Sequence, residues 1–303
     1  MQPLTTVAAW PGVEVRSSYE LQQTDMKLGR YEVSTVDFGT FRLDGGSMFG
    51  SVPKNIWGKR VHADDENCIA LATRSLLLKD GSRTILVDVG MGEKWNEKSR
   101  QIFAIKNTPV QDLPFERSEI TDIVLTHLHF DHAGGISEYR DGDPSKLTLT
   151  YPKATVHLQR SNFENGRKPG LKERASYLKE NIEVLLQGNL NLVDGDVEVL
   201  PGLWVCRANG HTVGQQWIEL RSEGQLLMYP TDLIPTSHHL PVPFHMGYDI
   251  CAGTVLSEKE RFLSRALEEE ALVVFQHDPE LVAATVAKDE RGHYVVRERH
   301  NTL

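Results

Sequence analysis

Cysteine is scarce in this 303-residue sequence, which contains only Cys68, Cys206 and Cys251. The three lie far apart and none belongs to a CxxC pair, so the sequence indicates neither a disulfide framework nor a thiolate zinc site. We therefore expect a reducing, cytoplasmic setting. No apolar run approaches the roughly 18 residues of a membrane span, and residues 1–15 lack the basic and apolar regions of a signal peptide. The sequence thus predicts no membrane partner.

Basic residues are also in the minority. The chain has 33 Lys and Arg against 42 Asp and Glu, which gives a net charge of −9 with His neutral. Proteins that hold nucleic acid through its phosphates need a clustered excess of positive charge, so we expect no nucleic-acid partner. No repeat, low-complexity tract or long Pro/Gly/Ser-rich linker interrupts the chain. We interpret residues 1–303 as a single domain, in which residues 1–30 form an irregular N-terminal arm.

Strands dominate the elements that the sequence predicts. Residues 31–46 alternate well enough for strands and end at a Gly45-Gly46 turn, and residues 75–90 form a hairpin with Asp80-Gly81 at its turn. Short apolar runs predict further strands at 120–126, 154–159, 203–208, 216–221, 225–230 and 271–276.

Two helices are predicted from periodicity. The spacing of Leu178, Ile182 and Leu185 predicts an amphipathic helix over 171–187. A capping box, Ser257-x-x-Glu260, predicts the start of a second helix. The apolar face of that helix comprises Phe262, Leu263, Ala266 and Leu267. Many strands with few helices favour an α+β fold of two sheets sandwiched between helices over an alternating βαβ array.

One stretch is rich in potential metal ligands. Residues 126–135 read THLHFDHAGG, which places His127, His129, Asp131 and His132 directly after a predicted strand. The glycine pair that follows allows the backbone to turn tightly and pack closely. Three more donors also follow predicted strands, namely His211, Asp232 and His277. Loops at the ends of buried strands are where a rigid scaffold holds functional side chains, so we expect these donors to meet.

The number and type of these donors indicate two metal ions. A lone HxH pair is often an accident, but HxHxDH with three further donors after separate strands is not expected by chance. Zinc sites take about four ligands, so seven donors exceed the need of one ion and fit two ions that share a bridging carboxylate. All the donors are nitrogen or oxygen, which suits zinc and is also compatible with Mn, Fe, Co or Ni.

The motifs resemble the metallo-β-lactamase-fold superfamily of dinuclear hydrolases. The resemblance covers most of the chain: a strand with Asp88, then THLHFDHAGG, GHTVGQ, TDL and FQHDP in the family's order. It implies a four-layer αββα sandwich with two divalent metal ions at one edge. It also implies ligand roles: His127, His129 and His211 for one ion, Asp131, His132 and His277 for the other. Asp232 would bridge the two ions, and Asp88 would support the site by hydrogen bonding.

Within the superfamily, segments 41–59 and 231–249 are similar to the branch of N-acyl-homoserine lactonases and methyl-parathion-type hydrolases. True β-lactamases usually replace the last motif histidine or place Cys at the bridging position, whereas this chain has His132 and Asp232. Flavodiiron proteins normally carry Glu at the second motif ligand and a flavodoxin domain. In some lactonases a Tyr three residues after the bridging Asp contacts the substrate carbonyl, and here that position is Pro235.

The resemblance implies an enzyme in which a hydroxide shared by two ions attacks an ester-like bond, with an N-acyl-homoserine-type lactone favoured. Phosphotriester or aryl-ester hydrolysis is the alternative. Asp232 would act as the bridge, and Asp131 would add general acid–base chemistry. An iron-containing redox protein and a non-catalytic binding module remain alternatives from other classes.

The expected partner is a small-molecule substrate, and a homodimer is also compatible with the sequence. Met48, Phe49 and Trp57 could line an apolar substrate pocket or simply form ordinary core. Phe130 is a further candidate for the pocket, although packing is the favoured interpretation of this residue. His157 lies in a predicted strand as a satisfied histidine. Three histidines follow the bridging position and are expected in solvated loops, with contact between one of them and the substrate as the alternative: His238, His239 and His245.

Overall fold

The computed structural model describes residues 26–303. Most of the predicted N-terminal arm therefore lies outside the described residues. Its last part is not an irregular arm, because Met26–Leu28 form strand β1, which pairs antiparallel with β2 (Tyr31–Asp44). Leu28 and Tyr31 are fully buried, which explains why this segment joins the sheet.

The first sheet has eight strands in the order β1-β2-β3-β4-β6-β9-β10, with β5 paired to β2. Their bounds are Cys68–Lys79 for β3, Thr84–Val87 for β4, Lys106–Asn107 for β5, Asp122–Val124 for β6, Thr155–Gln159 for β9 and Asn189–Val193 for β10. Strands β4, β6, β9 and β10 run parallel to one another. The carboxyl ends of these strands therefore lie at one edge.

The second sheet has seven strands in chain order. They are β11 (Val197–Leu200), β12 (Leu203–Ala208), β13 (Gln215–Ser222), β14 (Gln225–Tyr229), β15 (Leu272–Val274), β16 (Ala283–Lys288) and β17 (Tyr294–His300). Neighbours are antiparallel except β14 and β15, which are parallel. A separate pair consists of β7 (Ser137–Tyr139) and β8 (Leu147–Leu149).

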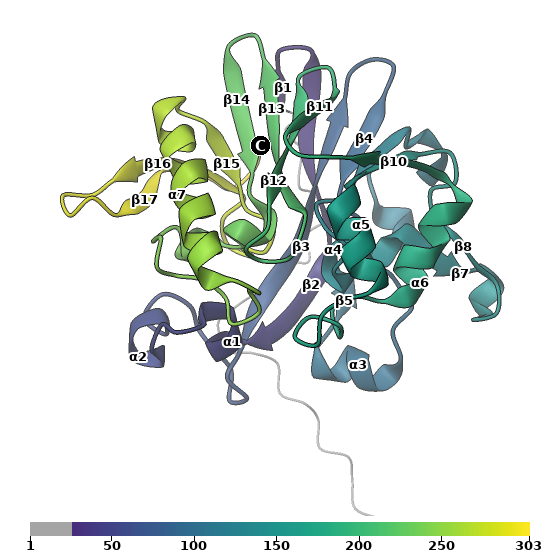
Figure 1. The fold of residues 1–303 in the computed structure, drawn as a ribbon, viewed down its shortest axis with the longest axis horizontal. Helices are drawn as coiled ribbons and strands as arrows, with labels where there is room; N and C mark the ends of the chain where they lie inside the picture. The colour runs from purple at the N-terminus through teal and green to yellow at the C-terminus, as the bar shows by residue number, and fades with distance from the viewer. Residues whose placement is uncertain (1–25) are drawn as a thin grey trace, which may run out of the picture.

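Within residues 26–303, seven α-helices accompany the two sheets. They are α1 (Gly45–Phe49), α2 (Lys54–Trp57), α3 (Glu97–Ile102), α4 (Phe130–Ala133), α5 (Arg160–Arg167), α6 (Lys179–Ile182) and α7 (Ala252–Glu268). Short 3-10 turns occur at Val110–Asp112, Arg117–Glu119, Gly134–Ile136, Arg140–Gly142, Glu183–Gln187, Thr231–Leu233 and Ser237–His239. In Figure 1, α7 lies on one side of the strands, and α5 and α6 lie on the other.

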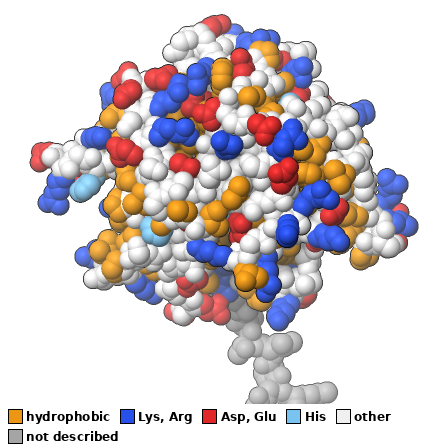
Figure 2. Space-filling model, in the orientation of Figure 1, with side chains coloured by type: hydrophobic (Ala, Val, Ile, Leu, Met, Phe, Trp, Pro, Cys, Tyr) orange, Lys and Arg blue, Asp and Glu red, His pale blue; other side chains and the backbone are white. Residues whose placement is uncertain are grey.

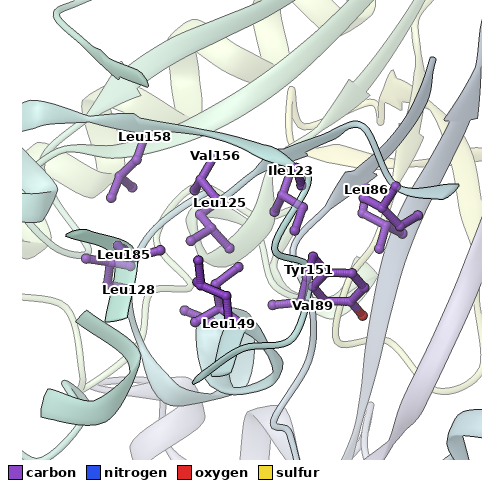
Figure 3. Close-up of a cluster of buried hydrophobic side chains, with 14 of the residues drawn as sticks. Leu86, Val89, Ile123, Leu125, Leu128, Leu149, Tyr151, Val156, Leu158 and Leu185 are labelled. Carbon is purple, nitrogen blue, oxygen red and sulfur yellow. The ribbon is translucent and has the colours of Figure 1, made fainter. Parts of the chain in front are cut away.

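Alternation along the strands divides the core into layers. Ile85 and Val87 of β4 belong to the cluster between the two sheets, whereas Leu86 belongs to the cluster beneath α5 and the following turns. Figure 3 shows Leu86, Ile123 and Val156 from neighbouring strands pointing toward the same space. Phe262 and Leu263 of α7 bury their side chains against the outer face of the second sheet. Each fully buried aliphatic side chain contributes about 1.5–3 kcal/mol. The predicted αββα sandwich is confirmed.

Both helix predictions need correction. No single helix spans 171–187: the chain makes turns until α6 begins at Lys179, and a 3-10 turn follows. Tertiary contacts override the periodicity, because Tyr177 forms a β-bridge with His129 and Glu173 bonds to Thr212. The capping box does not open α7, which begins at Ala252. Ser257 is an interior helix residue whose hydroxyl donates to the Thr254 carbonyl.

One face of the molecule shows how charged and apolar side chains are distributed. On the face drawn in Figure 2, acidic and basic side chains are interspersed with hydrophobic ones rather than gathered into one field. Among residues 26–303, no helix has both the length and the apolar character needed to cross a membrane.

Candidate metal centre

Strand order brings the predicted donors to one edge of the sandwich. Asp88 follows β4 and the HxHxDH motif follows β6, which is the parallel neighbour of β4. Asp232 follows β14 and His277 follows β15, which are again parallel neighbours. His211 follows β12. Because parallel strands end at the same edge, five strand ends deliver polar side chains to one place.

The backbone of the motif changes from extended to helical between its donors. His129 has an extended backbone and caps α4, and Asp131 and His132 lie within that short helix. The glycine pair is needed for close packing, because a Cβ on Gly134 would lie 2.0 Å from the Met91 carbonyl oxygen. A Cβ on Gly135 would lie 2.2 Å from the carbonyl oxygen of Val89. The backbone after β4 thus packs directly on the motif and fixes its position.

Seven buried side chains form two groups that share Asp232. The first group comprises His127, His129, His211 and Asp232; the second comprises Asp131, His132, Asp232 and His277. In each group one donor atom per residue lies within 4.8 Å of all the others. All seven predicted donors are therefore brought together.

In the first group, imidazole nitrogens face one another and the shared carboxylate. His211 Nε2 lies 3.1 Å from His129 Nδ1 and 3.1 Å from Asp232 Oδ2. His127 Nε2 lies 3.7 Å from the same Asp232 oxygen. His129 thus presents Nδ1 to the group, and its Nε2 lies 3.8 Å from Glu173 Oε2.

The second group has the same character. His277 Nε2 lies 2.9 Å from Asp232 Oδ1 and 3.3 Å from His132 Nε2. Asp131 Oδ2 is 3.6 Å from His132 Nε2 and 3.7 Å from His277 Nε2. The two oxygens of Asp232 are therefore nearest to imidazoles of different groups.

Most of the imidazoles are oriented through the ring nitrogen that faces away from the group. His132 Nδ1 lies 3.0 Å from Asp88 Oδ2, and His277 Nδ1 lies 2.7 Å from the Ala72 carbonyl oxygen. His211 Nδ1 lies 2.9 Å from Asp249 Oδ1. Such partners fix the tautomer that leaves the other nitrogen free to bind a metal ion.

Asp88 lies at the centre of this supporting layer. Its carboxylate accepts hydrogen bonds from the Thr126 N–H and hydroxyl, both at 2.8 Å, and from Gln276 Nε2 at 3.0 Å. The residue is fully buried and has a positive φ of 63°. The supporting contact predicted for Asp88 is thus present in the structure.

Burial and neighbouring charges shift the pKa values of several histidines in the site. Burial would lower the pKa of His211, but the carboxylates of Asp232 and Asp249 outweigh it and raise that pKa to about 10. Asp131 and Asp232 likewise raise the pKa of His132 well above its usual value against the effect of burial. His127 shows the opposite direction, since burial and the neighbouring imidazoles hold its pKa well below its usual value.

The residues fit a bound cation. Nε2 of His127 is buried without a hydrogen-bond partner, and Asp232 Oδ1 makes no well-aligned hydrogen bond although His277 is near. Two pairs of imidazole nitrogens also face each other. A buried polar atom without a partner is costly, and a divalent cation between these nitrogens and oxygens removes that cost. The site is therefore a divalent metal site by its chemistry.

A cavity of about 210 Å³ opens onto the donors. Its donor side includes His129, Asp131, His211, Asp232 and His277, and its apolar side includes Leu43, Met48, Leu71, Phe103, Phe130 and Met246. Lys172, Glu173 and Tyr248 add polar groups at the wall. Met48 and Phe130, two of the predicted pocket residues, therefore line the cavity.

Phe49 and Trp57 do not line this cavity. At most 1% of either side chain is exposed, and their rings stack on each other with centroids 5.2 Å apart, so both belong to the hydrophobic core that also contains Met48. His239 corrects another expectation, because it is buried rather than solvated. Its ring stacks on Phe49, and its two nitrogens contact Thr236 Oγ1 and the Met48 carbonyl oxygen. His157 is satisfied as predicted, with Nε2 2.8 Å from Asp122.

Sequence reasoning missed three residues of the site. Asp249 supports His211, Glu173 lies beside His129, and Tyr248 brings a phenol to the cavity. None belongs to a local motif. Glu173 was hidden by the predicted helix over 171–187, whereas the similarity of segment 231–249 to the lactonase branch marked the region of the other two.

The sequence model of the Metallo-beta-lactamase superfamily matches residues 69–277 of the chain. The chain therefore belongs to this superfamily. It is accordingly a metal-dependent hydrolase by fold and site. An N-acyl homoserine lactonase from Bacillus cereus is 27% identical over 237 residues, covering 71% of this chain and 84% of the relative. The N-acyl homoserine lactonase AiiA from Bacillus thuringiensis subsp. kurstaki is 28% identical over 228 residues, covering 67% and 80%.

Solved structures agree on the fold. A probable metal-dependent hydrolase from Staphylococcus aureus superposes with a TM-score of 0.80 at 26% identity, over 90% of this chain and 99% of the other. AidC, a dizinc quorum-quenching lactonase in complex with a product, gives a TM-score of 0.73 at 22% identity, over 91% and 97%. The second likeness concerns the fold alone. The two Bacillus lactonases confirm the predicted resemblance to the lactonase-like branch of the superfamily.

Proposed function

We propose that the chain is a dinuclear hydrolase that opens a lactone ring, with N-acyl-homoserine lactones as the favoured substrate class. The observation that carries this proposal is the position of Asp232, whose two oxygens are nearest to imidazoles of different donor groups. A carboxylate so placed would serve as the bridge between two ions. Zinc is the metal we expect, because five of the seven donors are imidazoles, which suit zinc; Mn, Fe, Co or Ni are compatible with the same donors.

Two bound ions would supply an activated water and would polarise the substrate carbonyl. The chain's own residues then orient the substrate and move protons. Asp131 lines the cavity and belongs to the second donor group, so its carboxylate is placed to hold or pass a proton near the reacting carbonyl. Glu173 and Lys172 provide further polar contacts at the cavity wall.

The apolar wall supports a substrate with a hydrophobic substituent. Met48, Phe103 and Phe130 line the same cavity as the donors. A carbonyl held at the donors would therefore place an attached apolar chain or ring against these side chains. Relatives named N-acyl homoserine lactonase favour the lactone over the phosphotriester or aryl-ester alternative.

The absence of a tyrosine at Pro235 is compatible with this proposal. The position has no phenol, but Tyr248 lines the same cavity and is about one-third exposed. Burial raises the pKa of Tyr248, so the phenol remains a hydrogen-bond donor at neutral pH.

A panel of hydrolysis assays tests the proposed substrate class. Protein loaded with Zn²⁺ should open N-acyl-homoserine lactones of several chain lengths faster than it cleaves aryl esters or phosphotriesters. Asp232→Ala, prepared in the same way, is the control for contaminating activity. Hydrolysis of phosphotriesters alone would replace the lactone with the alternative substrate. A metal-loaded protein that cleaves none of the three would refute the proposed function.

A further inference from the structure

The turn that carries Asp232 has an unusual backbone. Asp232 is the middle residue of the 3-10 turn Thr231–Leu233, and the preceding Thr231 is fully buried with a φ of +52°. A β-branched residue at positive φ is an outlier, because its side chain crowds the backbone in that region. Such a conformation persists only where surrounding contacts fix it. Within the turn, the Asp232 N–H donates to the Thr231 hydroxyl oxygen, and further contacts come from outside the turn.

Gln215, the first residue of β13, supplies those contacts. It is fully buried, and its amide oxygen accepts from the Thr231 hydroxyl at 2.7 Å, the Asp232 N–H at 3.2 Å and the Leu233 N–H at 3.0 Å. The orientation of the amide is assigned from these partners. In the opposite orientation, its NH₂ group would face both backbone N–H groups and contact only the Thr231 hydroxyl.

The same residue is joined to the loop of another donor. The Gln215 N–H donates to the carbonyl of Thr212, which directly follows His211. His211 Nε2 in turn lies 3.1 Å from Asp232 Oδ2. Gln215 thus links the turn of a donor in the first group to the turn of the carboxylate that both groups share.

We propose that Gln215 and Thr231 are positioning residues, which hold the Asp232 carboxylate between the two donor groups and thereby set the affinity for the second metal ion. This inference rests on the proposed dinuclear function. Neither residue lines the cavity, so both act through the backbone of Asp232 rather than on the substrate. Loss of a partner that orients a ligand typically costs 10–100-fold in metal affinity or activity.

Gln215→Met tests the role of the amide, because methionine fills a similar volume without accepting the three hydrogen bonds. Gln216→Met is a matched control on the next residue of β13. Gln216 is equally buried, but its amide bonds Gln159 and the Leu125 carbonyl instead of the Asp232 turn. Each full-length variant is stripped of metal and titrated with Co²⁺ alone, and binding is followed by the visible spectrum.

We expect wild-type protein and Gln216→Met to bind two equivalents of Co²⁺ with similar affinities. Gln215→Met should bind the second equivalent 10–100-fold more weakly and show an altered spectrum. Thermal unfolding of the metal-free proteins measures general destabilisation separately. Equal losses of cobalt affinity in both variants would identify a purely structural effect and would overturn the proposal.

Thr231 provides an independent test that does not depend on the stability of the Gln215 variant. Thr231→Val keeps the β-branch and removes the hydroxyl, whereas Thr231→Ser keeps the hydroxyl. The valine variant should weaken binding of the second Co²⁺, and the serine variant should restore it. If the wild type binds two equivalents of Co²⁺, and Gln215→Met and Thr231→Val bind them with unchanged affinity, the positioning role alone is overturned. Fewer than two equivalents in the wild type would overturn both the dinuclear function and this inference.

Discussion

The Asp232 carboxylate lies between His211 and His277, with Oδ2 3.1 Å from Nε2 of His211 and Oδ1 2.9 Å from Nε2 of His277. These histidines come from different strands of the second sheet and belong to different donor groups. The carboxylate thus contacts both groups, and within this cluster Nε2 of His127 and Nε2 of His129 are buried without a hydrogen-bond partner.

The support of His211 by Asp249 gives a first prediction. Asp249→Asn replaces an acceptor by an amide that can present NH₂ to His211 Nδ1, which lies 2.9 Å from the aspartate oxygen. The tautomer needed at the metal is then disfavoured, so metal affinity or kcat should fall about 10–100-fold. Metal titration and steady-state assays measure this loss.

Asp122→Asn is the matched control for that prediction, because Asp122 forms a buried pair with His157, which is not one of the seven donors. It should lower stability with little change in metal affinity. An unchanged metal affinity in Asp249→Asn would show that this carboxylate does not orient a ligand.

Tyr248 gives a prediction about the reaction itself. Tyr248 lines the cavity together with the donors, where its phenol can donate a hydrogen bond to a substrate oxygen. Tyr248→Phe should therefore lower kcat for the best lactone about tenfold or more, with two metal ions retained. Tyr139→Phe, on β7, should have no effect. Equal kcat values for Tyr248→Phe and wild type would remove the phenol from the mechanism.

His239 predicts a dependence of stability on pH. Burial lowers its pKa to about 3, assisted by the nearby Lys259 and opposed by the Met48 carbonyl. Because the unfolded chain takes up this proton near pH 6.5, the unfolded state binds more protons between pH 6.5 and about 3. Native stability should therefore fall as the pH is lowered through this window, by at most about 1.4 kcal/mol per pH unit.

Denaturant unfolding of wild type and His239→Gln at pH 7 and pH 5 isolates this contribution. Glutamine keeps a donor for the Met48 carbonyl but does not titrate in this range, so the variant should lose less stability between the two pH values. Parallel losses in both proteins would mean that His239 does not carry the effect.

The fold and the donors were accessible from the sequence for a physical reason. Strands β6, β12, β14 and β15 are short apolar runs with donors a few residues after each, and Asp88 follows the similar run of β4. Local pattern therefore located both the element and the polar side chain. The periodicity of Leu178, Ile182 and Leu185 misled, because Glu173 and Tyr177 bind residues elsewhere in the chain and hold the segment in turns.

Supporting residues could not be read in the same way. Asp249 meets His211 across 38 positions of sequence, and nothing in the local pattern predicts that contact. Phe49 and Trp57 were candidates for the pocket because they are aromatic and lie near Met48. The packing of the molecule, which local sequence does not specify, decides that Met48 lines the cavity and the two rings belong to the core.

Metal stoichiometry in wild type and Asp232→Ala tests the central claim that Asp232 bridges two ions. Each metal-stripped protein is incubated with Zn²⁺, dialysed and analysed for zinc per chain, with thermal unfolding as the check on folding. Wild type should retain about two ions per chain. Folded Asp232→Ala should retain fewer and lose hydrolytic activity. Retention of both ions and of activity by Asp232→Ala would contradict the bridging role.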